Sequence, residues 1–260
     1  MITLYFSGTG NTKFLAEVFS RNMGAKCLSI EADADFVAEI TAHDTIAVCY
    51  PIYHSRVPLV MRRFVHAYKA AFAGKKLAIL VTQQALSGDG ARVFTDLFAV
   101  GEVDVIYAEH FNMQQNMGNI PVWSALFAPT TRSRRKFTEK TETKVRRVCE
   151  SIKNGVVKKR GFTQFSQYVG YIQGKPWQKD TASIMPVRLE KRLMQDVRIH
   201  PNCTSCGVCA KICPMKNLQH RGGQIRPQNN CTVCYRCVNR CPQKAITVYV
   251  HRKPKWQYHF

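Results

Sequence analysis

The cysteines in the last third of the chain have the spacing of metal ligands. Eight of the 11 cysteines lie between Cys203 and Cys241, in two runs of the pattern C-x2-C-x2-C-x3-C-P. Thiolates are strong ligands for soft metal ions and clusters, and clustered cysteines inside a cell rarely serve as disulfides. The pattern therefore predicts metal ligation.

The two cysteine runs form an internal repeat. Apolar residues flank both runs at matching positions, Val197 with Ile225 before each run and Leu218 with Ile246 after it. Each half is too small to bury a core alone. The repeat predicts two half-domains packed about a pseudo-twofold axis.

This spacing resembles that of bacterial two-cluster ferredoxins, in which the fourth cysteine of each run ligates the other cluster. The resemblance implies one 4Fe-4S cluster held by Cys203, Cys206, Cys209 and Cys241, and a second held by Cys231, Cys234, Cys237 and Cys213. A pair of structural zinc sites is the alternative. Zinc modules usually present C-x2-C pairs separated by a longer loop, so the spacing favours clusters.

A second chemical motif lies near the start of the chain. The apolar run Met1–Phe6 is followed by Ser7-Gly8-Thr9-Gly10-Asn11-Thr12, and apolar residues then recur at helical spacing as far as Gly24. Such a strand, loop and helix place backbone N–H groups, hydroxyls and the positive helix end around one phosphate. The loop that binds nucleoside triphosphates is excluded because it needs Gly-Lys-Ser/Thr. The dinucleotide-binding fingerprint is excluded because Lys13 takes the place of its third glycine.

The loop is similar to the phosphate loop of flavodoxins, since Ser7, Thr9, Gly10 and Thr12 match [ST]-x-T-G-x-T. The resemblance implies FMN. Two later loops are similar to those that cover the flavin ring in that family, and they supply Pro51, Ile52, Tyr53 and His54, and Gln84, Gly88, Asp89 and Gly90. Tyr53 is expected to stack on the ring, the alternative being that Tyr53 and His54 belong to an ordinary exposed loop.

The elements needed to position these loops are apparent in the hydrophobic pattern. Strands are predicted at Ala25–Ile30, 45–50, 77–81 and 103–108, with helical patterns between most of them. The pattern predicts an α/β fold with a doubly wound five-stranded parallel sheet. The resemblances imply that this sheet is flavodoxin-like, in the order 2-1-3-4-5, and that a small α+β two-cluster ferredoxin domain follows it. Ligands of such sheets bind past the carboxyl ends of the first and third strands.

The predicted domains are 1–160 (flavodoxin-like, FMN-binding), 161–196 (connector), 197–252 (two-cluster ferredoxin) and 253–260 (tail). An amphipathic helix with a basic face is expected within 132–160, as the last helix of the first domain. A membrane-surface helix is the alternative. Cys27, Cys49 and Cys149 are expected to be buried thiols without chemistry.

The net charge of +21 is concentrated in the second half of the chain. Residues 1–112 are nearly neutral, whereas residues 161–260 hold 16 Lys and Arg against 3 Asp and Glu. This indicates an acidic partner, a membrane surface or nucleic acid. Of these we expect a redox partner protein with an acidic docking surface, and nucleic acid is not favoured. There is no apolar run of the roughly 18 to 20 residues that span a bilayer and no signal peptide, so a cytoplasmic protein is expected.

Together the motifs resemble the flavodoxin-ferredoxin fusion proteins of anaerobes. The resemblance implies an electron-transfer flavoprotein that passes single electrons between two 4Fe-4S clusters and FMN, and no catalytic residue is predicted. One alternative is an FMN-dependent oxidoreductase that reduces a small acceptor such as a quinone. The other is a redox-sensing protein that binds an anionic surface or nucleic acid.

Overall fold

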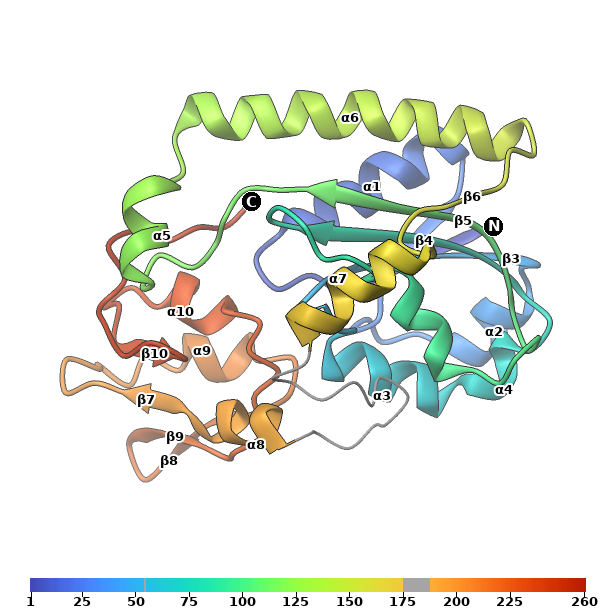
Figure 1. Ribbon diagram of the computed structural model, residues 1–260. Coiled ribbons are helices and arrows are strands. Elements are labelled where there is room, and N and C mark those ends of the chain that lie inside the picture. Colours follow the sequence, from blue (N-terminus) through green and yellow to red (C-terminus); the bar gives the residue numbers. More distant parts are fainter. Residues whose placement is uncertain (54, 175–187) are drawn as a thin grey trace.

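A parallel sheet with helices on both faces forms the N-terminal part of the protein in the computed structural model (Figure 1). The structure describes residues 1–53, 55–174 and 188–260. The sheet has the order β2-β1-β3-β4-β5-β6. Its strands are β1 (Ile2–Tyr5), β2 (Lys26–Ser29), β3 (Thr45–Pro51), β4 (Lys76–Gln83), β5 (Asp104–Asn112) and β6 (Lys158–Lys159). The flavodoxin-like doubly wound fold is confirmed.

The sheet has one strand more than the five predicted. β6 pairs in parallel with β5, with Tyr107 opposite Lys158, and the backbone N–H of Arg160 donates to the carbonyl of Ala108 at 3.0 Å. Two basic residues show no strand periodicity, which is why the hydrophobic pattern missed this edge strand. The predicted end of the domain at Lys158–Gly161 is thus a paired strand and the turn after it.

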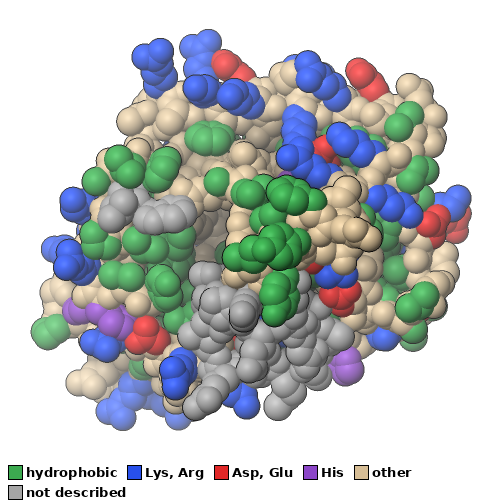
Figure 2. Space-filling model, viewed as in Figure 1, with side chains coloured by type: hydrophobic (Ala, Val, Ile, Leu, Met, Phe, Trp, Pro, Cys, Tyr) green, Lys and Arg blue, Asp and Glu red, His purple; other side chains and the backbone are tan. Residues whose placement is uncertain are grey.

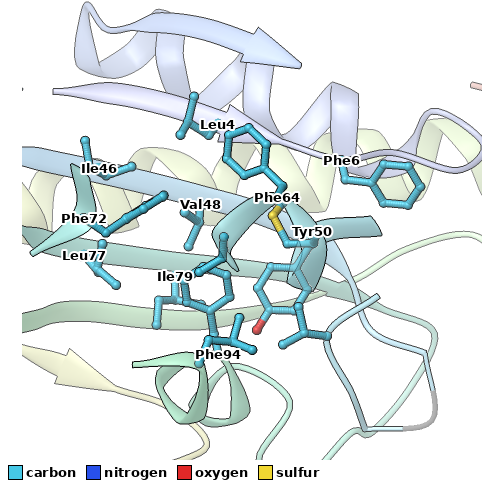
Figure 3. Close-up of a cluster of buried hydrophobic side chains, with 14 of the residues drawn as sticks. Leu4, Phe6, Ile46, Val48, Tyr50, Phe64, Phe72, Leu77, Ile79 and Phe94 are labelled. Atoms are coloured by element: carbon cyan, nitrogen blue, oxygen red, sulfur yellow. The ribbon is translucent and has the colours of Figure 1, made fainter. Parts of the chain in front are cut away.

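Side chains that alternate along the central strands build a core on each face. Ile46, Val48 and Tyr50 of β3 face one layer, and Ala47 and Cys49 face the other. The first layer is formed by α2 (Phe36–Thr41), α3 (Leu59–Ala67), α4 (Lys69–Phe72) and the 3-10 helix η1 (Arg92–Leu97), and Figure 3 shows its packed side chains. The second is formed by α1 (Asn11–Met23) and α6 (Thr131–Lys153).

The expected helix within 132–160 is α6. It buries Thr141, Val145 and Val148 against the sheet, while its Lys and Arg side chains line the upper edge of the molecule (Figure 2). Its N-terminus is capped by Thr130 and Ser133, whose side chains each accept from the other's backbone N–H. Cys49 and Cys149 are buried, and Cys27 is half-buried.

The cysteine-rich region lies beyond the carboxyl ends of the strands (Figure 1). Its elements are β7 (Val197–Ile199), α9 (Val208–Lys211), β8 (Leu218–Arg221), β9 (Gln224–Pro227), α10 (Arg236–Arg240) and β10 (Ile246–Val248). β7 pairs antiparallel with β10, and β8 with β9. The repeat flanks Val197, Ile225, Leu218 and Ile246 all pack in one core, as the matching positions indicate.

Three further helices are α5 (Pro121–Leu126), between β5 and α6, and α7 (Gln164–Gly174) and α8 (Arg188–Gln195), between β6 and β7. The predicted connector 161–196 therefore contains two of them, α7 and α8. Its residues 175–187 lie outside the described residues. α8 is tied to α3 by a hydrogen-bonded ion pair between the buried Arg62 and Glu190, at 2.5 Å.

A buried carboxylate joins β5, β6 and α6. Glu109 accepts from Lys158 at 2.9 Å and Arg160 at 3.2 Å, and it lies 3.0 Å from Lys144 Nζ. Burial raises the pKa of Glu109, but the hydrogen bonds from Lys158 and from the His110 backbone, with the charge of Lys144, lower it to about 2. The ionised carboxylate is therefore the form that stabilises the fold.

Low pH should weaken the ion pairs of Glu109 and so lower the stability of the fold. The folded pKa of Glu109 lies below the unfolded value of about 4.3, so its stabilisation is complete above pH ~5 and is lost as the pH falls towards 2. We expect Glu109→Gln to lower the free energy of unfolding at pH 7 by roughly 2 kcal/mol and to flatten its decline over that range, measured by urea denaturation. Glu17→Gln, an exposed carboxylate paired with Lys13, is the control. A Glu109→Gln profile parallel to that of the wild type would contradict this role.

Candidate cofactor site

A cavity of about 540 Å³ opens at the carboxyl ends of β1, β3 and β4. Its volume suits a cofactor-sized ligand. Nine of the residues predicted from sequence line it: Ser7, Gly8, Thr9, Asn11, Thr12, Pro51, Ile52, Tyr53 and Gln84. The structure thus brings the three predicted loops together around one space, at the position expected for a flavodoxin-like sheet.

The phosphate loop is shaped by a glycine and by hydroxyl contacts. Gly10 has φ 106, and its backbone N–H donates to Ser7 Oγ at 3.1 Å. The Thr12 and Thr82 hydroxyls lie 2.7 Å apart, which ties the start of α1 to the end of β4. Asn116 Nδ2 donates to Thr9 Oγ1 at 2.9 Å. Hydroxyls, backbone N–H groups and a helix N-terminus therefore meet here, which suits an anion.

The two other loops form the wall farther along the sheet. Tyr53 and Arg56 exchange backbone hydrogen bonds in a tight turn, with Ser55 at φ 58. Burial raises the pKa of Tyr53 well above its usual value, so its hydroxyl stays protonated. On the β4 side, Gln83 Nε2 donates to Asn112 Oδ1 at 2.7 Å, and Ser87 donates to Gln83 Oε1. Gln83 is thereby fixed in the cavity wall.

Of the other five predicted residues, four do not line the cavity in the structure. Gly10 turns towards Phe260, and Gly88 packs against Gly170 of α7. Asp89 is buried and pairs with Arg92 at 2.8 Å, and the Gly90 carbonyl accepts from Tyr50 at 2.8 Å. The fifth, His54, lies outside the described residues.

Sequence reasoning missed a third side of the cavity. The segment after β5 contributes Met113, Gln114, Gln115, Asn116 and Met117, and the cysteine-rich region contributes Val233, Tyr235 and Tyr249. The first group has no motif. The second group lies within or after the second cysteine run. That run was interpreted only as a source of metal ligands, so its neighbouring residues were not expected in the cavity.

The cysteines of the two runs keep matching backbone environments. Cys203 Sγ accepts from the N–H of Ser205 at 3.4 Å, as Cys231 Sγ does from Val233 at 3.2 Å. Cys213 and Cys241 each accept at 3.2 Å from the N–H four residues later. Ser205 and Val233 also share a positive φ, of 53 and 57. A positive φ is uncommon in a β-branched residue such as Val233, and in both repeats it occurs in the residue whose N–H donates to sulfur.

The thiols also group across the repeats. Cys203, Cys206, Cys209 and Cys241 line one small cavity of about 10 Å³, and Cys213 does not. Burial, with the neighbouring thiols of Cys234 and Cys213, raises the pKa of Cys231 to about 12. Within the described residues, no three His, Cys, Asp or Glu side chains form a group that could hold a metal ion. The first four thiols, which come from both runs of the repeat, nevertheless lie beside one another around this cavity.

The fold and the cavity agree with a comparison of the sequence with known families. A family model described as a flavodoxin domain matches residues 2–153. The chain belongs to the flavodoxin family. Flavodoxin-like domains bind FMN, so its flavodoxin domain is of a kind used for flavin-dependent redox chemistry and electron transfer. No curated protein matches the chain.

Solved structures similar to the flavodoxin domain include a flavodoxin from the domain Archaea, with 18% identity over 58% of this chain and 97% of that chain (TM-score 0.40). A flavoprotein from Bacteroides eggerthii has 18% identity over 50% and 98% (TM-score 0.37). The rubredoxin:oxygen oxidoreductase from the anaerobe Desulfovibrio gigas has 12% identity over 60% of this chain and 37% of that chain (TM-score 0.39).

The cysteine-rich region packs directly on the phosphate loop of the flavodoxin domain. A Cβ placed on Gly8 would lie 2.5 Å from the carbonyl oxygen of Cys234 and 2.9 Å from the Tyr53 hydroxyl. Cys234 is buried in the flavodoxin core cluster itself. No helix of the described chain is long and apolar enough to cross a lipid bilayer.

Proposed function

We propose that this protein is an electron-transfer flavoprotein that holds FMN in the flavodoxin domain and two 4Fe-4S clusters in residues 197–252. The observation that carries the proposal is the shared wall of the cavity. Val233 and Tyr235, which flank Cys234, line the same cavity as the phosphate loop. A group held by the second cysteine set would therefore border the flavin site.

The residues around the cavity fit FMN. The N–H groups of the loop and the hydroxyls of Ser7, Thr9 and Thr12 suit the phosphate, and the walls at Pro51–Tyr53 and Gln84 suit the flavin ring. Bound flavin would supply the ability to take up one or two electrons. Tyr53, whose hydroxyl lies against Gly8, helps to close the cavity towards the cysteine-rich region.

The cysteine sets fit two clusters, with Cys203, Cys206, Cys209 and Cys241 as one set and Cys213, Cys231, Cys234 and Cys237 as the other. Four-iron clusters supply single-electron exchange. The N–H groups of Ser205, Asn217, Val233 and Ala245, which already donate to sulfur, would offset the charge of the ligating thiolates. A structural zinc site has no need of a neighbouring flavin cavity.

The test is a kinetic one. Anaerobically prepared protein is reduced photochemically by one electron, and electron transfer between the clusters and the flavin is followed by their absorbance. We expect the rate of this transfer to be independent of protein concentration, because both groups are held in one chain. A rate proportional to protein concentration, or no exchange between the two chromophores, would contradict the proposal.

We further propose that the redox partner is an acidic protein. Residues 197–260 contain 11 Lys and Arg and no Asp or Glu. Cys206 is exposed, and beside it stand the exposed Val208 and Lys211 of α9. An exposed apolar residue beside a lysine, in a region without acidic residues, suits an acidic electron carrier, whose association is steered by opposite charge.

With an acidic bacterial ferredoxin as the probe, we expect the second-order rate of electron transfer to fall steeply between about 0.05 and 0.3 M salt. Lys211→Glu should lower that rate about tenfold at low salt. Lys136→Glu, on the distant basic helix α6, is the matched control and should change it far less. A rate insensitive to salt, or a larger loss with Lys136→Glu, would exclude docking beside Cys206.

A further inference from the structure

Three consecutive carbonyl oxygens of the phosphate loop are hydrogen-bonded by the cysteine-rich region and the segment after it. Arg236 Nη2 donates to the Ser7 carbonyl at 2.7 Å, and Arg236 Nε donates to the Gly8 carbonyl at 3.2 Å. The backbone N–H of Phe260 donates to the Thr9 carbonyl at 2.9 Å. The whole outer side of the loop is therefore held by residues more than two hundred positions away in the sequence.

Holding these carbonyls also directs the N–H groups that an anion needs. In a planar trans peptide, the C=O and the following N–H point in opposite directions. Because the Ser7 and Gly8 carbonyls face Arg236, the N–H groups of Gly8 and Thr9 face away from it. A flipped peptide at either position would present an oxygen to the phosphate in place of a donor.

Arg236 is suited to this task because all five of its N–H donors are in use. Besides the two loop carbonyls, it donates to Glu31 at 2.8 and 2.6 Å and to the Ile212 carbonyl at 2.9 Å. Glu31 balances the charge of Arg236. The effect of the guanidinium on the loop is therefore to fix the orientation of the two carbonyls. A lysine could not satisfy this planar fork.

The segment Gln257–Phe260 holds the other end of the loop (Figure 1). Tyr258 is fully buried, and its hydroxyl donates to Asn11 Oδ1 at 2.5 Å, while its N–H donates to Asn239 Oδ1 at 2.7 Å. The Phe260 ring stacks on Phe14 of α1, with 4.5 Å between the ring centroids. The segment thus links Asn239 of α10, which lies between the predicted cluster ligands Cys237 and Cys241, to the start of α1.

We propose that Arg236 and Tyr258 are positioning residues for the phosphate group of the flavin, so that the cysteine-rich region sets the preference of the flavodoxin domain for FMN over riboflavin. This inference rests on the proposed function, because it takes FMN as the ligand. It extends that function by making flavin selection depend on a residue of the cysteine motif. A structural role alone would weaken both flavins equally, whereas positioning of the phosphate loop affects only the phosphorylated one.

The test measures dissociation constants for FMN and for riboflavin by flavin fluorescence, with flavin-depleted protein prepared anaerobically. We expect Arg236→Gln to weaken FMN at least tenfold and riboflavin no more than about twofold, since the loop carbonyls lose their charged donor. The FMN dissociation constant of Arg236→Lys should lie between those of the wild type and Arg236→Gln. Arg240→Gln, at the exposed end of the same helix, is the matched control and should change neither constant.

Tyr258→Phe provides a second variant away from the cysteines. It removes only the hydroxyl that contacts Asn11, and we expect it to weaken FMN several-fold with riboflavin binding and iron content unchanged. An unchanged ratio of FMN to riboflavin affinity in both Arg236→Gln and Tyr258→Phe would overturn this inference alone. Failure of the wild-type protein to bind FMN would instead overturn the proposed function.

Discussion

Cys206→Ser is expected to remove about four of the roughly eight iron atoms per chain, and Cys241→Ser the same four. Both thiols line one cavity with Cys203 and Cys209, although they come from different runs of the repeat. Cys206 is exposed, so serine is tolerated there without a loss of core packing. The measurement is iron and sulfide content per chain after anaerobic purification.

Double variants test the crossed pairing directly. Cys206→Ser with Cys241→Ser should still retain about four iron atoms, because both changes affect one cluster. Cys206→Ser with Cys213→Ser should retain almost none, although Cys206 and Cys213 belong to one run. Cys27→Ser, a half-buried thiol of β2, is the control and should keep all the iron. The opposite result for the two double variants would show that each run holds its own metal.

Gly8→Ala is expected to weaken FMN binding by between about ten and a hundredfold. The added methyl group would lie 2.5 Å from the Cys234 carbonyl and 2.9 Å from the Tyr53 hydroxyl. The backbone carbonyl cannot move without shifting the cysteine loop, and forcing a methyl group into such a contact typically costs about 1–3 kcal/mol. The phosphate loop should therefore be displaced from Arg236. The measurement is the dissociation constant of FMN for the variant and the wild type.

The control for this change is Gly74→Ala. Gly74 has φ 72, and a Cβ there meets nothing within 4 Å, so the variant should lose some stability and no flavin affinity. If Gly8→Ala bound FMN as tightly as the wild type, the close packing of the cysteine loop on the phosphate loop would be unrelated to flavin binding.

The sequence contained enough information for five of the six strands and for two sides of the cavity. The strand periodicity of β3 and β4 and the loop Ser7–Thr12 are local signals, because they depend on neighbours within a few residues. The same is true of the end of α1, which ends at Met23 with Gly24 as its C-cap, as predicted, whereas its start at Asn11 lies within the predicted loop. Local patterns of this kind can be recognised without knowing the fold.

The remaining parts of the site depend on contacts between distant segments. Gln114 lines the cavity because the segment after β5 lies beside α1, where Asn11 donates to its carbonyl, and Tyr235 because the cysteine-rich region covers the strand ends. The role of Arg236 depends on Ser7 and Gly8, and no spacing rule connects these residues. Asp89 was expected beside the flavin but lies buried against Arg92, because polarity in a loop does not reveal which side of it faces the cavity.

The central claim is that a flavin and two iron-sulfur clusters occupy one chain. It is tested most directly by anaerobic purification followed by an absorbance spectrum and by counts of flavin, iron and acid-labile sulfide per chain. The expected result is about one FMN, eight iron and eight sulfide. Colourless protein, or protein that contains zinc with neither iron nor flavin, would contradict it.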